Sequence, residues 1–333
     1  MEVFHRPEVL IADPGVDDAI GLLVSAAMPG EKEFVATFGN ATTEITSANY
    51  RGLEDFIHTN LQAPVGEREV YLGAEKPEAD LMDFIHGERA IEGQFEGFAP
   101  ATASSHVLYD RLAEERKWGI DVVSLGALRE VAAVLNRPDA DNIKSLTVMG
   151  GAIGVQGNIA PRVEANIGGD PKALQTVLAR AKELGIPMTI IPLDVTQLPE
   201  LEFTPERVEK LAESLVRRGS KNVADLLVKL VGPDATYTKF YQNKEGVFGN
   251  RPPYGIQRYQ GAAMHDLTAI LVKEHPELFT TVKMPIAGAD NGELLIPTGW
   301  MSEYTATECN VVMDVIDPLE YWRLTEEYLA RYS

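Results

Sequence analysis

The chain has 333 residues, of which 45% are hydrophobic and 24% are charged, as in an ordinary globular protein. Its formal net charge of −20 disfavours binding to nucleic acid or to anionic membranes, because both are polyanions. Its single cysteine, Cys309, excludes an intrachain disulfide, and we interpret this thiol as structural. The start lacks the pattern of a signal peptide, and no apolar run is long enough to span a membrane. We therefore expect a cytoplasmic protein that binds a cation or a small polar molecule.

Short apolar runs alternate with helix-like runs over the first part of the chain. The strand candidates are rich in β-branched residues and lie at 8–13, 33–38, 69–73, 121–126, 145–151 and 187–195. The helix candidates lie at 17–28, 46–59, 127–138 and 171–185. Near-continuous apolarity indicates strands that are buried on both faces, as in a parallel sheet. The alternation predicts an α/β fold with an open, doubly wound, mostly parallel sheet flanked by helices, whose ligands gather at the carboxyl ends of the strands.

The alternation weakens after about residue 200, where helical patterns dominate. The expected elements are two helices or one broken helix at 204–231, a loop-rich stretch at 241–261, a helix at 264–276, strands at 281–288 and 306–316, and a helix at 317–332. No linker or internal repeat divides the sequence. We expect a single domain, residues 1–333, with a mostly helical C-terminal region near the site.

Three carboxylates surround a Pro-Gly turn at the end of the first expected strand. Asp13 ends the strand, and Asp17 and Asp18 begin the next helix, where negative charge is favoured by roughly 0.3–1 kcal/mol each. Helix capping explains one or two of these acids, but it explains Asp13 less readily. A hard cation explains all three, because Ca²⁺ and Mg²⁺ take carboxylate oxygens. The spacing is not that of an EF-hand loop.

Polar side chains also follow other expected strands. Asn40 follows the second strand, where an ordinary turn is the simpler interpretation. Residues 149–171 contain many glycines, which let backbone approach a ligand closely, but no GxGxxG or P-loop pattern. In this stretch Asn158, Glu164 and Asn166 offer amide and carboxylate groups that are suited to several hydroxyls.

As a set, these motifs resemble the inosine-uridine preferring nucleoside hydrolase family. The opening IADPGVDD is similar to the family's DxDPGxDD. The other matches follow in the family's order and are Gly39-Asn40, Met149-Gly150-Gly151, Gly157-Asn158, Glu164-Ala165-Asn166, Asp170-Pro171, LDVT at 193–196 and His265-Asp266. Each match alone is weak, and the His-Asp pair alone reads equally well as a helix cap beside an exposed histidine. The matches span residues 10 to about 270 and are specific as a set.

The resemblance implies a nucleosidase with a tightly bound Ca²⁺ ion. It assigns the metal ligands as Asp13, Asp18, Asp266 and the backbone carbonyl of Leu125. It assigns the groups that hold the ribose hydroxyls as Asp17, Asn40, Asn158, Glu164 and Asn166. The implied reaction is hydrolysis of the N-glycosidic bond of a ribonucleoside to ribose and free base, in nucleoside catabolism and salvage. Relatives are often homodimers or homotetramers, so a homo-oligomer is expected.

Two residues would carry the chemistry. Ca²⁺ is a weak Lewis acid, so a carboxylate must still activate the water, and Asp13 is the candidate base. His265 is the candidate donor to the leaving base, with stacking or hydrogen bonding without proton transfer as the alternative. Tyr237 and Tyr241 are four residues apart and would share a helix face, where they stack on a base, close a lid or pack in the core.

Three departures from the family pattern leave alternatives open. Ile11 replaces the first aspartate, and Arg129-Glu130 replaces a Thr-Asn pair. The loop HGERAIEG, residues 86–93, keeps only its first two residues, although His86 is still expected to line the site. The alternatives are a hydrolase of another or modified riboside, and a calcium-dependent ribose- or nucleoside-binding protein without turnover. A metal-dependent phosphohydrolase is less well supported, because no phosphate-cradling loop is present.

Overall fold

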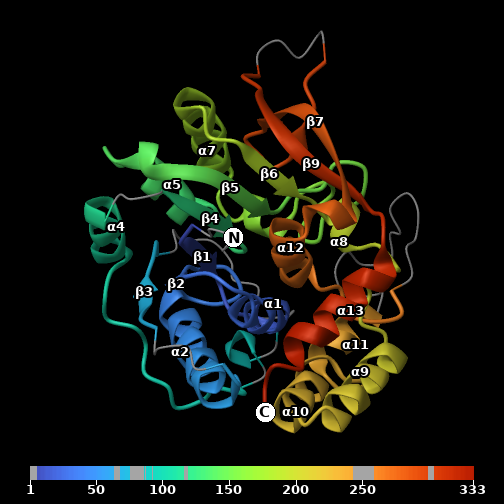
Figure 1. Cartoon of the computed structure of the whole chain (residues 1–333). Coiled ribbons are helices and arrows are strands. Elements are labelled where there is room, and N and C mark those ends of the chain that lie inside the picture. The colour runs from blue at the N-terminus through green and yellow to red at the C-terminus, as the bar shows by residue number, and fades with distance from the viewer. Residues whose placement is uncertain are drawn as a thin grey trace.

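The computed structural model describes residues 6–63, 68–75, 86, 88–91, 93–115, 119–242, 259–298 and 304–333. In this part of the chain nine strands form one sheet in the order β3-β2-β1-β4-β5-β6-β9-β7-β8 (Figure 1). The strands are β1 Glu8–Ala12, β2 Lys32–Ala36, β3 Val70–Leu72, β4 Ile120–Ser124, β5 Ile143–Met149, β6 Met188–Ile191, β7 Phe279–Gly288, β8 Leu294–Leu295 and β9 Thr307–Val315. Neighbours from β3 to β9 are parallel, whereas β7 runs antiparallel to β9 and β8. The predicted open, mostly parallel α/β sheet is confirmed.

Helices cover both faces of the sheet (Figure 1). They are α1 Val16–Ala27, α2 Thr43–Asn60, α4 Ser105–Glu115, α5 Arg129–Leu135, α6 Ala165–Gly168, α7 Pro171–Leu184, α8 Leu193–Thr196, α9 Pro205–Arg217, α10 Lys221–Val231, α11 Thr236–Gln242, α12 His265–Glu274 and α13 Pro318–Leu329. The first apolar core joins the sheet to α1, α2, α12 and α13, and the second joins it to α4, α5 and α7. Because apolar helices lie on both sides, the central strands are mostly apolar after their first residues, and every residue of β1 is buried.

The order of the first six strands places a topological switch point beside β1. The chain leaves β1 for β2 on one side and returns to β4 on the other, so the loops after β1 and β4 diverge. Ligands of doubly wound sheets bind in the crevice outside the carboxyl ends of such strands. The α12 helix packs against α1 beside this point, so its first residues reach the same edge.

Several sequence predictions needed adjustment. The predicted strand at 187–195 ends at Ile191, because Pro192 begins the short helix α8. The segment 204–231 forms two helices, α9 and α10, which Gly219 separates with a positive φ of 90°. The helix α4 was not predicted, and most of the loop-rich stretch, residues 243–258, lies outside the described residues.

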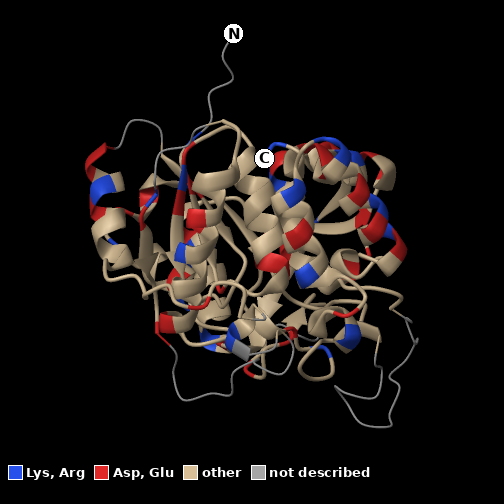
Figure 2. Ribbon diagram, turned by 90° about the horizontal axis from the view of Figure 1, so that it is seen from below, with Lys and Arg blue, Asp and Glu red and all other residues tan. Residues whose placement is uncertain are grey.

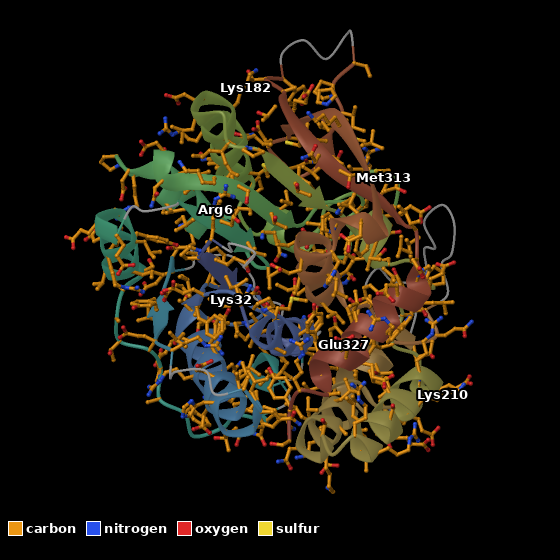
Figure 3. The ribbon with its side chains drawn as sticks, in the orientation of Figure 1. Arg6, Lys32, Lys182, Lys210, Met313 and Glu327 are labelled. Atoms are coloured by element: carbon orange, nitrogen blue, oxygen red, sulfur yellow. The ribbon has the colours of Figure 1, made fainter. Side chains whose placement is uncertain are left out.

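A cluster of charged side chains lies at the amino ends of the strands. This amino-edge cluster comprises Glu8, Lys32, Asp121, Lys273 and Glu274. Lys32, labelled in Figure 3, is buried, and its Nζ lies 2.5 Å from Glu8 Oε2. Lys273 and Glu274 end α12, so this helix runs from the carboxyl edge of the sheet to its amino edge.

The outer surface carries charges of both signs. On the side seen in Figure 2, acidic and basic positions are interspersed along the outer helices. Arg323 on α13, for example, pairs with Glu320 at 2.6 Å and with Glu327. Among the described residues, no helix combines the length and the apolarity that a membrane crossing requires.

Candidate active site

The site begins with Asp13, directly after β1. Its Oδ2 accepts a hydrogen bond from Asn40 N at 2.6 Å, and its backbone oxygen accepts one from Asn40 Nδ2 at 3.0 Å. Glycines make this close approach possible: a Cβ on Gly39 would lie 2.1 Å from Asp13 Oδ2, and a Cβ on Gly126 would lie 2.4 Å from Asp13 Oδ1. The loops after β1, β2 and β4 therefore meet around one carboxylate.

The first turns of α1 and α12 bring three more carboxylates together. Asp17, Asp18 and Asp266 each offer an oxygen, and these oxygens all lie within 4.8 Å of one another. Asp18 Oδ2 caps α1, because it accepts from Gly15 N at 2.9 Å, and it also accepts from Asn40 Nδ2 at 3.1 Å. Helix capping was the simpler interpretation of these acids, and in the structure it accounts for one carboxylate oxygen, Asp18 Oδ2. We call Asp13, Asp17, Asp18 and Asp266 the carboxyl-edge acidic group.

Burial raises the pKa of every member of this group, and repulsion between carboxylates adds to it for Asp13, Asp17 and Asp266. Burial, followed by repulsion from Asp18, raises the pKa of Asp17 to about 8. The same two causes raise the pKa of Asp13 and of Asp266 well above their ordinary values. Burial raises the pKa of Asp18 to about 6. Such shifts mean that the folded chain alone opposes full ionisation of these carboxylates.

The residues fit a hard cation. Asp18 Oδ1 and Asp266 Oδ1 are buried and have no hydrogen-bond partner among the described residues. No lysine or arginine in the described ranges pairs with any of the four carboxylates. A purely oxygen donor set suits Ca²⁺ or Mg²⁺ better than zinc or copper. The group that the geometry selects contains Asp17, whereas the resemblance assigned Asp13 as a ligand. The assignment of Asp13 therefore stays a prediction.

The glycine-rich segment after β5 brings the predicted amide and carboxylate groups to the same edge. Glu164 is buried and caps α6, and its carboxylate accepts from Gly151 N at 3.0 Å and from Asn166 N at 2.9 Å. Asn158 Oδ1 accepts from Ala165 N at 2.9 Å. These contacts hold the segment in one conformation, because each one ties a side chain to a backbone N–H of the same loop.

Leu125 is joined to this segment through its backbone. Asn166 Nδ2 donates to Leu125 O at 2.8 Å, so the carbonyl predicted to ligate the metal is also a hydrogen-bond acceptor. A carbonyl oxygen has two lone pairs, and one remains for a further partner. The Leu125 side chain is buried in the apolar core and takes no part.

His265, the first residue of α12, is held at both ring nitrogens. Its Nδ1 lies 2.7 Å from Thr196 Oγ1, and its Nε2 lies 2.7 Å from Tyr241 Oη. Burial lowers the pKa of His265 to about 4, so the imidazole is neutral at pH 7. Any proton that it supplies to a leaving group at neutral pH therefore comes from the neutral ring or through Tyr241.

His86 and Tyr237 also lie beside the acidic group. His86 Nδ1 accepts from Val16 N at 3.1 Å and lies 4.0 Å from Asp17 Oδ1. Burial, followed by the charge of His265, lowers the pKa of His86 to about 3. The ring centroids of His86 and Tyr237 lie 4.9 Å apart, and those of Tyr237 and Tyr241 lie 5.1 Å apart. The expected shared face of the two tyrosines is confirmed, and both are buried.

Sequence reasoning missed two residues of α8. Thr196 holds His265, and Asp194 accepts hydrogen bonds from Ile153 N at 2.9 Å and from Gly154 N at 2.6 Å. Both belong to the LDVT segment, which the sequence singled out without a role. Asp194 lies in the strand expected at 187–195, whereas Thr196 lies just beyond its end. A carboxylate inside an expected apolar strand was the available signal.

The departures from the family pattern have structural counterparts. Ile11 is fully buried in the apolar core beside α4, α5 and α7, where an aspartate would need its own partner. Arg129 Nε pairs at 2.7 Å with Asp170 Oδ2, and Asp170 caps α7. Of the altered loop, residues 87 and 92 lie outside the described residues. Cys309, the expected structural thiol, is buried in β9, and burial raises its pKa to about 12.

A doubly wound sheet with such a group at its switch point belongs to the class of enzymes that act on small polar molecules. Over residues 9–323 the chain matches, and belongs to, the family of inosine-uridine preferring nucleoside hydrolases. It is 31% identical over 288 residues to the pyrimidine-specific ribonucleoside hydrolase RihA of Salmonella dublin, covering 83% of this chain and 82% of that protein. It is 28% identical over 323 residues to a probable uridine nucleosidase 1 of Oryza sativa subsp. japonica, covering 91% and 89%.

Solved structures agree with this placement. The purine-preferring ribonucleoside hydrolase from Gardnerella vaginalis matches with a TM-score of 0.73 and 25% identity, covering 98% of this chain and 99% of that one. A plant nucleoside hydrolase matches with a TM-score of 0.77 at 21% identity over the same shares, which shows the fold. The predicted family and enzyme class are confirmed: the protein is an N-ribohydrolase that cleaves the N-glycosidic bond of nucleosides. Its homo-oligomeric state and cytoplasmic location stay predictions.

Proposed function

We propose that the protein hydrolyses ribonucleosides with a Ca²⁺ ion bound at the carboxyl-edge acidic group. One observation carries this proposal: in the described part of the chain, Asp18 Oδ1 and Asp266 Oδ1 are buried without a hydrogen-bond partner inside a group of like charges. Burying even one unpaired carboxylate is costly, and four together are stable only with neutralisation. Protons supply it in the free chain, and a divalent cation supplies it when bound.

The proposed ligands are Asp13, Asp18, Asp266 and the carbonyl of Leu125. Asp18 and Asp266 belong to this set under either interpretation, because the geometry and the family pattern both include them. Asp17 is then the carboxylate that turns toward a ribose hydroxyl, together with Asn40, Asn158, Glu164 and Asn166. Ca²⁺ tolerates six to eight oxygens in irregular geometry, which suits ligands that come from three separate segments: the β1–α1 junction, the end of β4 and the start of α12.

When bound, Ca²⁺ would supply positive charge that holds the ribose hydroxyls and orients a water. Asp13 removes a proton from that water, because it stands at the end of a rigid strand with Asn40 N fixing one oxygen. The transition state of glycoside cleavage has oxocarbenium character. The surrounding carboxylates favour this positive charge as it develops on the sugar.

Departure of the base is assisted by His265 and Tyr241. The two side chains are joined at 2.7 Å, and Tyr241 lies near enough to Asp17 for that charge to raise the pKa of the phenol after burial. A neutral imidazole and a phenol both donate hydrogen bonds, which is sufficient to stabilise a leaving base as it gains charge. His86 and Tyr237 then supply further ring faces beside the acidic group.

The test is the release of reducing sugar from inosine, uridine, cytidine, adenosine and guanosine. We expect the wild-type protein to release sugar from at least one of the five, and Asp13→Ala to release almost none from the same substrate. Asp234→Ala is the matched control, because the Asp234 side chain is fully exposed. Equal activity of Asp13→Ala and the wild type would contradict the role of Asp13. If a folded protein with Ca²⁺ bound released sugar from none of the five, the result would indicate that the substrate is another or a modified riboside.

A further inference from the structure

The single turn α8 contains Thr196, the polar partner of His265 Nδ1 among the described residues. Thr196 is 1% exposed, and its Oγ1 lies 2.7 Å from His265 Nδ1. Helical threonines often donate their hydroxyl to the carbonyl four residues earlier, as Thr268 and Thr325 do here at 2.8 Å. Among the hydrogen bonds of the described residues, Thr196 Oγ1 has His265 as its only partner. The hydroxyl of Thr196 is thus committed to the histidine.

Donor counting then selects one tautomer. If His265 Nδ1 carried the proton, the hydroxyl proton of Thr196 would have no acceptor in a buried place, which is costly. If Nδ1 is the acceptor, the hydroxyl proton is satisfied and the ring proton resides on Nε2. A neutral imidazole has one donor and one acceptor nitrogen, so both contacts at 2.7 Å are satisfied in this arrangement.

The consequence reaches Tyr241. With the ring proton on Nε2, the phenol oxygen of Tyr241 accepts from His265, and its own proton is directed elsewhere. Among the hydrogen bonds of the described residues, the other partner of Tyr241 Oη is Tyr237 Oη at 3.5 Å, which is long for a bond between hydroxyls, and Tyr237 donates to Ala263 O at 2.9 Å. Within this part of the chain no closer acceptor meets the Tyr241 proton, which leaves it for a bound ligand.

We propose that Thr196 is a positioning residue that fixes the Nε2–H tautomer of His265 and thereby leaves the Tyr241 hydroxyl proton free for the leaving base. This proposal rests on the proposed role of the His265–Tyr241 pair. Thr196 itself touches no substrate, and it acts through the ring that it orients.

The first measurement is the tautomer of His265 in the wild-type protein. Two-bond ¹⁵N–¹H couplings in histidine-labelled protein show which ring nitrogen carries the proton, and His265→Asn assigns the resonance by its loss. We expect a protonated Nε2 and a hydrogen-bonded, unprotonated Nδ1. A protonated Nδ1 would overturn the proposal, and this result needs no variant of Thr196 that folds.

The second measurement compares Thr196→Val with Thr196→Ser. Valine keeps the shape and removes the hydroxyl, so we expect kcat to fall about tenfold with KM within about twofold, and the Nδ1 resonance to move toward that of a free imine. Serine should keep kcat within about threefold and leave the resonance in place. Thr325→Val is the matched control, because it removes a buried helical hydroxyl in α13 and should leave kcat unchanged.

The outcomes separate the two proposals. A Thr196→Val variant with wild-type kcat and an unmoved Nδ1 resonance would overturn the role of Thr196. Full kcat in His265→Ala would instead overturn the proposed role of the histidine, while the wild-type tautomer would still test the effect of Thr196 on the ring.

Discussion

The two edges of the sheet place different charges beside their buried carboxylates. At the amino edge, Glu8 lies between Lys32 at 2.5 Å and Lys273 at 2.9 Å. Burial alone would raise the pKa of Glu8, but its hydrogen bond with Glu274 and the two lysines hold it at about 2. At the carboxyl edge, four carboxylates have no lysine or arginine beside them in the described part of the chain, and their pKa values rise.

This difference separates a structural cluster from a binding site. The amino-edge cluster carries two lysines as counter-charges, and they hold Glu8 ionised, although burial still raises the pKa of Glu274 to about 7. The carboxyl-edge acidic group is incomplete without protons or a cation, and it lies at the switch point where ligands bind. The same helix, α12, supplies Asp266 to one edge and Lys273 to the other, so the contrast is built into one element.

The largest expected effect follows from neutralising the acidic group. Asp266→Asn should lower kcat/KM by roughly 10³-fold, because the variant removes a ligand and a charge that stabilises the transition state. It should also leave the metal-free protein as stable as the wild type or more stable, since repulsion with Asp18 disappears. Steady-state kinetics and thermal unfolding in chelator check both parts.

Asp225→Asn is the control for this variant, because Asp225 is exposed on α10. Loss of activity together with a marked loss of metal-free stability in Asp266→Asn would show that the residue serves the fold, and it would remove the contrast between the edges.

The next effect concerns the amino-edge cluster. Lys32→Met should lower the free energy of unfolding by about 3 kcal/mol, because it leaves Glu8 and Glu274 sharing a buried site with Lys273 alone. The kcat of the folded fraction should stay within about twofold of the wild type. Denaturant unfolding and sugar release at 25 °C measure the two quantities. A large loss of kcat in fully folded Lys32→Met would mean that the edges are coupled through α12.

The smallest expected effect is on pH dependence. Asp17 has a pKa of about 8 in the folded state against an ordinary value of 3.8, so the folded state binds more protons between these values. The stability of the metal-free protein should therefore fall as pH rises from about 4 to about 8. Ca²⁺ replaces the protons, so its affinity should rise over the same range. Saturating Ca²⁺ at pH 8 should raise the melting temperature by on the order of 5 °C.

Melting curves at pH 5 and pH 8, with chelator and with Ca²⁺, test this prediction. A metal-free protein that becomes more stable between pH 5 and pH 8 would contradict the pKa shifts. Repeating the melting curves with Mg²⁺ in place of Ca²⁺ identifies the preferred ion, which is the one that raises the melting temperature more.

Much of the fold was predictable because local pattern and burial agree in it. The run at 8–13 is apolar because β1 is buried on both faces, and Asp13 follows it because the strand ends where the site begins. Pairing across long distances was not predictable. Glu8 and Lys273 are 265 residues apart, and the local sequence around neither residue predicts their ion pair.

The site was predictable as a set of residues but not as a geometry. The motifs named Asp18, Asp266 and Asn40, which the structure brings together. They did not show that Asp17, rather than Asp13, joins Asp18 and Asp266 in the group of oxygens that could hold a cation. That grouping depends on how the first turns of α1 and α12 meet. They also missed Thr196, since its role depends on where α8 meets α12.

The most direct test of the account is a calorimetric titration of Ca²⁺ into the chelator-treated protein at pH 8. The account predicts one ion per chain in the wild type and in Lys32→Met, and none in Asp266→Asn. Equal binding in Asp266→Asn, or a folded and fully active wild-type protein that binds no divalent cation, would contradict the claim that the unpaired carboxylates of the carboxyl edge form the metal site.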